Sequence, residues 1–163
     1  MALSRLLRTL RRADEPDRLK LLKSLSEEQR KELRYHWSVW ARADQQPPAG
    51  DWRLWLIMAG RGFGKTRAGA EWVRGIAKAN PQARIALIGA SLIDGRGVMV
   101  EGESGLIAAS SPRGAPTYEP SLRRLTWPNG AQATLYSAYE PESLRGPQHS
   151  HACRPVAKRR VRQ

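Results

Sequence analysis

The sequence has little cysteine and no long apolar run. Cys153 is the single cysteine among 163 residues, which excludes an internal disulfide. The three histidines, His36, His149 and His151, are too scattered to predict a zinc site. No apolar stretch approaches the ~20 residues of a membrane span, and residues 1–5 lack the apolar stretch of a signal peptide. We therefore expect a soluble cytoplasmic protein whose length fits one domain.

Acidic residues are absent from the end of the chain. No Asp or Glu follows Glu142, and residues 151–163 are basic, with Arg154, Lys158, Arg159, Arg160 and Arg162. The formal net charge is +13, and an excess of this size indicates contact with polyanions such as nucleic acid. A solvated charged surface is the commoner explanation of such an excess.

A glycine-rich stretch that ends in lysine and threonine is the strongest motif. Residues 59–66 read AGRGFGKT, which is the pattern G-x-x-x-x-G-K-[ST] with Ala59 in place of the first glycine. The apolar run at residues 54–58 predicts a strand, and residues 66–79 predict a helix. Strand, loop and helix in this order are the context of a phosphate-binding loop, because backbone N–H groups and the helix N-terminus must converge on one anion.

This interpretation gives the loop residues distinct roles. Lys65 would reach the β- and γ-phosphates as a point charge, and Thr66 would offer its hydroxyl to Mg²⁺. The sequence thus predicts a site for ATP with Mg²⁺, and the alternative is a glycine-rich turn that simply joins a strand to a helix. The predicted cofactor-binding residues of this loop are Ala59, Gly60, Gly62, Phe63, Gly64, Lys65 and Thr66.

The rest of the chain predicts an α/β protein. Residues 1–36 favour two short amphipathic helices, with Ser26 and Gln29 as a capping box, and residues 36–55 favour an extended connector. Residues 84–89 have the length and composition of a buried parallel strand, which implies a right-handed crossover and a doubly wound domain. Residues 123–138 predict a β-hairpin with the turn signal Asn129-Gly130.

Several short motifs besides the loop resemble one known family, over about residues 40–148. They are Trp40-Ala41-Arg42, Gln45, Pro47-Pro48, Gly50-Asp51-Trp52, residues 60–72, residues 98–102, residues 118–121, Leu125-Thr126-Trp127-Pro128-Asn129-Gly130 and Leu144-Arg145-Gly146-Pro147-Gln148. With these motifs the chain resembles the large terminase subunit, the DNA-packaging ATPase of tailed bacteriophages, prophages and gene transfer agents.

The resemblance implies a P-loop NTPase fold of the additional-strand type, which couples ATP hydrolysis to translocation of double-stranded DNA. The partners it implies are DNA, the small terminase subunit and the portal, with a homo-oligomer only in the intact family. It also implies that Arg61 touches the γ-phosphate and that Gln45 recognises adenine. Arg145 falls at the place of a trans-acting arginine finger. The alternative for Arg145 is a loop arginine that pairs with Glu142.

The sequence departs from the family at its end. The family pattern continues with an apolar strand ending in Asp-Glu, which orders Mg²⁺ and activates water, and no such strand follows Gln148 here. We expect three parts: a helical segment (1–36), a partial, truncated P-loop ATPase domain (37–150) and a basic tail (151–163). A frameshift near Ala152 is the hypothesis for this tail, and a genuine DNA-contacting tail is the alternative.

The missing acids make ATP binding without hydrolysis the expected activity of this chain alone. Two other classes stay open at this point. A small-molecule P-loop kinase predicts an arginine-rich lid. A non-enzymatic basic nucleic-acid-binding protein predicts salt-dependent DNA binding that survives Lys65→Ala.

Overall fold

The computed structural model describes residues 3–155, and its contacts divide the chain into two compact units with the boundary between Gln46 and Pro47. The first unit is helical. It contains α1 (Leu3–Arg12), α2 (Glu15–Ser24), α3 (Glu27–Leu33), α4 (Trp37–Trp40) and the 3₁₀ turn η1 (Ala43–Gln45). Its core is a cluster of five buried apolar residues: Leu6, Leu10, Leu25, Leu33 and Val39.

The helices of the first unit begin where capping residues occur. Ser26 and Gln29 form the predicted capping box: the Gln29 N–H donates to Ser26 Oγ at 3.2 Å and the Ser26 N–H donates to Gln29 Oε1 at 3.0 Å. Three helices cover residues 3–33 instead of two, because Asp14 caps a new helix that tolerates Pro16 in its first turn. The connector is also less extended than predicted, since α4 buries Val39 and the Trp40 indole N–H donates to the Leu33 carbonyl.

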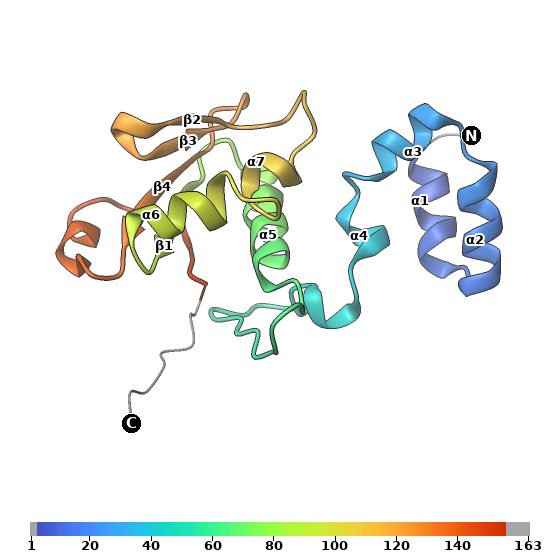
Figure 1. The fold of residues 1–163 in the computed structure, drawn as a ribbon, viewed down its shortest axis with the longest axis horizontal. Helices are drawn as coiled ribbons and strands as arrows, with labels where there is room; N and C mark the ends of the chain where they lie inside the picture. Colours follow the sequence, from blue (N-terminus) through green and yellow to red (C-terminus); the bar gives the residue numbers. More distant parts are fainter. Residues whose placement is uncertain (1–2, 156–163) are drawn as a thin grey trace. The chain divides into compact units, whose positions relative to one another are not determined.

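The second unit combines one long helix with a five-stranded sheet (Figure 1). The sheet order is β2-β3-β4-β1-β5, with β4 and β5 parallel to β1 and the β2–β3–β4 pairs antiparallel. The predicted parallel strands therefore form the core of a mixed sheet. The helices and strands of the second unit are α5 (Lys65–Ala79), β1 (Arg84–Gly89), α6 (Leu92–Asp94), the π-helical η2 (Gly95–Val100), α7 (Leu106–Ala109), β2 (Thr117–Glu119), η3 (Pro120–Leu122), β3 (Arg124–Thr126), β4 (Gln132–Ser137), η4 (Pro141–Leu144) and β5 (His151–Cys153).

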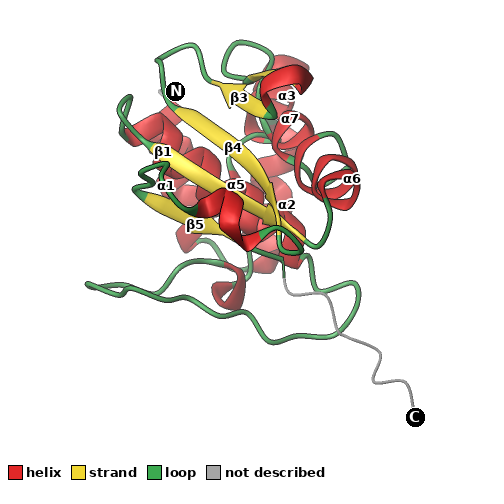
Figure 2. Ribbon diagram, turned by 90° about the vertical axis from the view of Figure 1, so that its left-hand side faces the viewer, coloured by secondary structure: helices red, strands yellow, loops and turns green. Residues whose placement is uncertain are grey.

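The core of the second unit lies between the sheet and helices α5, η2 and α7. Ile85 and Leu87 of β1 belong to the same buried cluster as Val73 and Ala77 of α5, and Leu135 of β4 lies beside Leu87. These strand residues share a face because side chains alternate along a strand. Figure 2 shows β1, β4 and β5 lying across α5 in this unit. Ala77, near the end of α5, bonds to Asn129 just before β4, and Gly69, near its start, lies beside Cys153 at the end of β5, so α5 begins at the carboxyl end of the parallel strands.

The predicted hairpin is confirmed, with Thr126 opposite Gln132 and Arg124 opposite Thr134. Its turn is docked on the end of α5, because the Asn129 amide donates to the Ala77 carbonyl at 2.8 Å. The Asn129 side-chain oxygen also accepts from the Ala131 N–H, and Gly130 takes a φ of +97° that favours glycine. The Trp-Pro-Asn-Gly motif therefore has a structural role, because it attaches the hairpin turn to the end of α5.

The predicted strand at residues 54–58 is wrong for this structure. No described strand contains these residues, and Leu54, Leu56 and Met58 are 82%, 58% and 85% exposed. A strand forms only where a neighbour satisfies its backbone groups, and within residues 3–155 the sheet ends at β5, whose pairing is with β1.

Conversely, β5 lies in the segment that was predicted to be a basic tail. The Ser150 N–H donates to the Arg84 carbonyl at 2.8 Å, and residues 151–153 then pair with residues 85–87 of β1. Residues 156–163, which carry most of the predicted tail, lie outside the described residues. Within the described part of the chain, no helix is long and apolar enough to cross a bilayer.

Candidate nucleotide-binding site

The glycine-rich loop turns directly into α5. Gly62 and Gly64 have φ values of +81° and +88°, in the left-handed region where a side chain is strained. Gly64 is the N-cap of α5, and its carbonyl accepts from the Ala68 N–H at 2.9 Å. Two glycines of the motif are therefore required by the backbone itself, which allows the loop to curl around the start of the helix.

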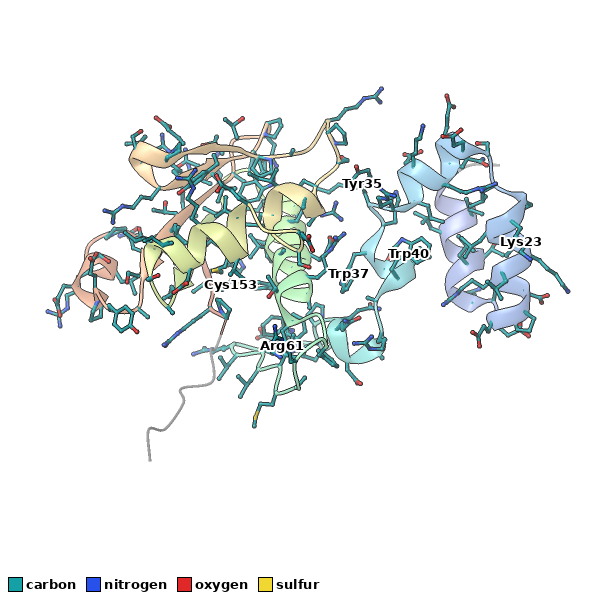
Figure 3. The ribbon with its side chains drawn as sticks, in the orientation of Figure 1. Lys23, Tyr35, Trp37, Trp40, Arg61 and Cys153 are labelled. Atoms are coloured by element: carbon teal, nitrogen blue, oxygen red, sulfur yellow. The ribbon has the colours of Figure 1, made fainter. Side chains whose placement is uncertain are left out.

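The start of α5 is an electropositive position. The helix has 15 residues, about 22 Å of aligned peptide dipoles, and its first N–H groups have no partner within the helix. The Lys65 ammonium donates to the carbonyls of Ala59 and Gly60 at 2.8 and 2.7 Å, so it lies over the beginning of the loop. Arg61 is exposed on the same loop (Figure 3). This arrangement fits a phosphate group.

A Mg²⁺ ion at this site would take most of its ligands from the nucleotide and from water. Thr66, the predicted ligand, follows Lys65 in the first turn of α5. Within residues 3–155 no group of three or more His, Cys, Asp or Glu side chains is placed to hold a metal ion. Mg²⁺ commonly keeps several waters and binds through substrate phosphates with one or two protein ligands. One hydroxyl ligand from Thr66, beside phosphate oxygens and water, is compatible with this preference. The role of Thr66 as a Mg²⁺ ligand stays a prediction.

Aromatic packing holds the segment that precedes the loop. The centroid of the Trp52 ring lies 6.2 Å from that of Trp72 in α5 and 6.1 Å from that of Trp55. The Trp52 indole N–H donates to the Pro48 carbonyl at 2.9 Å. The Trp72 ring in turn contacts His151 of β5 at 5.9 Å. These contacts, in place of a paired strand, attach the segment before the loop to α5 and β5.

The two other predicted site residues lie outside the loop. Gln45 belongs to the first unit and is buried, and its amide oxygen accepts from the Arg42 N–H at 3.0 Å. Arg145 forms an ion pair with Glu142 at 2.9 Å, which is the alternative that the sequence left open for this arginine. Both side chains are largely exposed, and exposed pairs contribute about 0–1 kcal/mol to stability. The adenine contact of Gln45 and the trans-acting role of Arg145 stay predictions.

Sequence reasoning missed a buried charge on α5. Glu71 has a side chain that is 1% exposed and forms ion pairs with Arg67 and Arg74, each at 2.7 Å. The signal was present, since the two arginines stand four residues before and three residues after the acid, which are spacings that face each other on a helix.

The surroundings of Cys153 disfavour it as a nucleophile. It lies on β5 beside α5, and a Cβ atom built on Gly69 would be 3.2 Å from its Sγ. Burial raises the pKa of the Cys153 thiol to about 11, so the thiol stays protonated near neutral pH. The glycine at position 69 therefore has a packing explanation.

His149 predicts a pH dependence of stability. Its ring packs edge-on against Tyr136 at 5.2 Å, and neither ring nitrogen has a hydrogen-bond partner within the described residues. Burial lowers the pKa of His149 from its ordinary value near 6.5, because the imidazolium is disfavoured there. The unfolded chain then binds a proton more readily than the folded one. The contribution of neutral His149 to the free energy of unfolding is therefore complete above about pH 6.5. It is lost as the pH falls through the pKa that His149 has in the folded chain.

The measurement is urea unfolding between pH 5 and 7.5, for the wild type and for His149→Phe, which keeps the ring contact and cannot be protonated. The wild type should lose more unfolding free energy below pH 6.5 than the variant. Parallel curves for the two proteins would refute the assignment to His149.

A comparison with protein families matches residues 56–153 to the family described as terminase large subunit, T4likevirus-type, N-terminal. The match spans more than half of the chain and includes the loop, α5 and all five described strands. Comparisons with curated proteins and with solved structures found no significant match. The chain therefore belongs to the terminase large subunit family, whose N-terminal region it matches.

Proposed function

We propose that this chain binds ATP through residues 59–66, as the ATPase region of a phage DNA-packaging terminase. The observation that carries the proposal is the loop geometry: two left-handed glycines, the Lys65 ammonium over the loop, and the start of a 15-residue helix meet at one place. Membership in the terminase large subunit family supports ATP as the nucleotide.

Each residue of the loop has a part in binding. Lys65 would exchange its carbonyl partners for the β- and γ-phosphates, and the N–H groups of residues 60–66 would donate to phosphate oxygens. Thr66 would hold Mg²⁺, and Arg61, which is exposed, would contact the γ-phosphate. Bound MgATP supplies an activated phosphoryl group. Gln45 contacts adenine, and Arg145 acts on the nucleotide of a neighbouring subunit in an assembly.

Hydrolysis is the part of the cycle that we propose this chain does not perform alone. Phosphoryl transfer depends on groups that hold the metal and orient the attacking water. Residues 143–163 hold no Asp or Glu, and the last two acids before them are exposed, Glu140 directly before the η4 turn and Glu142 on it. The residues that carry this proposal thus belong to the phosphate-binding part of an ATPase site. Double-stranded DNA, the small terminase subunit and the portal are its proposed partners, and the cytoplasm its proposed location.

Steady-state phosphate release tests this proposal. With excess MgATP, the wild-type rate should equal that of Lys65→Ala and of buffer alone. Lys78→Ala is the matched control, because Lys78 is exposed near the other end of the same helix. ATP turnover that Lys65→Ala abolishes and Lys78→Ala retains would show that the chain hydrolyses ATP and would contradict the proposed loss.

A further inference from the structure

A buried carboxylate joins three turns of the helix that carries the phosphate loop. Glu71 Oε1 accepts from the Arg67 guanidinium, with Nε at 2.9 Å and Nη2 at 2.7 Å. Its other oxygen, Oε2, accepts from Arg74 Nη2 at 2.7 Å. Arg67 lies in the first turn of α5, directly after Thr66, so the cluster begins next to the proposed phosphate site.

The cluster also connects α5 to a second helix. Arg74 Nη1 donates to the carbonyl of Ala109, the last residue of α7, at 3.1 Å. A chain of charge-assisted hydrogen bonds therefore runs from the first turn of α5 through Glu71 to the end of α7. Such bonds are short and directional, and they fix the relative position of the groups they join.

Stability alone does not explain a charge at this position. Burying a carboxylate and its partners costs several kcal/mol in desolvation, and apolar residues of similar volume often serve a fold as well or better. Residues 70 and 73, next to Glu71, are an alanine and a valine in the hydrophobic core. Apolar residues in place of all three charged side chains could fill the same volume, so we look for a role of the charges in geometry.

The loop depends unusually on α5 for its position. Residues 54–58, which lead into it, are not paired in any described strand, and they are attached through the aromatic contacts of Trp52. Beyond the loop, the backbone of Gly64 passes directly into the first turn of α5. The orientation of that turn therefore determines where the N–H groups and Lys65 point.

We propose that Glu71 is a positioning residue for the phosphate loop: with Arg67 and Arg74 it holds the first turn of α5 against α7. Glu71 itself touches no phosphate in this account. Its effect on ATP binding rests on the proposed function, whereas its effect on the first turn does not depend on any ligand. The two effects can be measured separately.

The experiment compares Glu71→Gln with Leu125→Ala, a buried change on β3 that destabilises the unit and lies outside the cluster of Glu71, Arg67 and Arg74. Solution conditions are adjusted so that both proteins have the same unfolding free energy. Amide hydrogen exchange is then followed at Ala68, whose N–H closes the first turn on Gly64. Exchange at Ala68 should be roughly tenfold faster in Glu71→Gln, and ATP affinity roughly tenfold weaker, which is the size of effect expected when a hydrogen bond to a charged group is lost.

Equal exchange at Ala68 in the two proteins would overturn the proposal. If Glu71→Gln does not fold, Arg74→Gln takes its place, because it cuts the link to α7 and leaves the Arg67–Glu71 pair. Faster exchange at Ala68 in Arg74→Gln supports the positioning role, and unchanged exchange contradicts it. If the wild type fails to bind ATP, the proposed function fails, and the exchange result still decides the role of Glu71.

Discussion

Replacing Lys65 by alanine is expected to weaken ATP binding by at least roughly 100-fold, which corresponds to about 2.7 kcal/mol. The ammonium would contribute charge-assisted hydrogen bonds to two phosphates, each worth about 1.5–3 kcal/mol. In the structure it bonds to the carbonyls of Ala59 and Gly60, so binding exchanges neutral acceptors for charged ones. Isothermal titration with ATP and Mg²⁺ measures the effect.

Lys78→Ala is the control for charge. It removes the same charge from the same helix about 20 Å from Lys65, beyond the Debye length at physiological salt. Its ATP affinity should stay within about twofold of the wild type. If Lys65→Ala bound ATP as tightly as Lys78→Ala, the glycine-rich loop would not be the nucleotide site.

Replacing Leu87 by alanine is expected to have the largest effect on stability. Leu87 is fully buried at the centre of the sheet, where β1 places it between Leu135 of β4 and Cys153 of β5. Truncation of such a leucine removes its transfer free energy and leaves a cavity, at a cost of about 2–5 kcal/mol. Domains have a total of about 5–15 kcal/mol, so the loss would be a large fraction of it. Urea unfolding measures the change.

Leu54→Ala is the matched control, because Leu54 is 82% exposed. Its cost should stay within about 0.5 kcal/mol, as for other surface substitutions. The comparison also tests the position of residues 54–58. If Leu54→Ala cost as much as Leu87→Ala, these residues would be packed in the protein, against the structure described here.

The parts of the fold that depend on local signals could be predicted from the sequence. Residues 84–89 are a short apolar run and form β1 with the predicted bounds. The helix after the loop begins at Lys65, one residue before the prediction, because Gly64 provides a left-handed N-cap. The capping box at Ser26 and the hairpin turn at Gly130 are likewise set by residues three or fewer apart. Local chemistry decides these elements.

The parts that depend on partners distant in the sequence could not be predicted. Residues 54–58 have the composition of a buried strand, but a strand also needs an edge to pair with. Residues 151–153 have no strand signal and form β5 because β1 offers them an edge. In the candidate site, the glycine and lysine pattern indicated the loop, whereas the Arg74 contact with Ala109 joins residues 35 apart and has no sequence signature.

The central claim is that ATP binds at the start of α5. Its most direct test is a titration of ¹⁵N-labelled protein with MgATP, in which the backbone amides are followed one by one. We predict saturable shifts that centre on Gly60, Gly62, Gly64, Lys65 and Thr66 and that disappear in Lys65→Ala. Shifts that centre elsewhere in the chain, or saturable ATP binding that leaves these amides unmoved, would contradict the account.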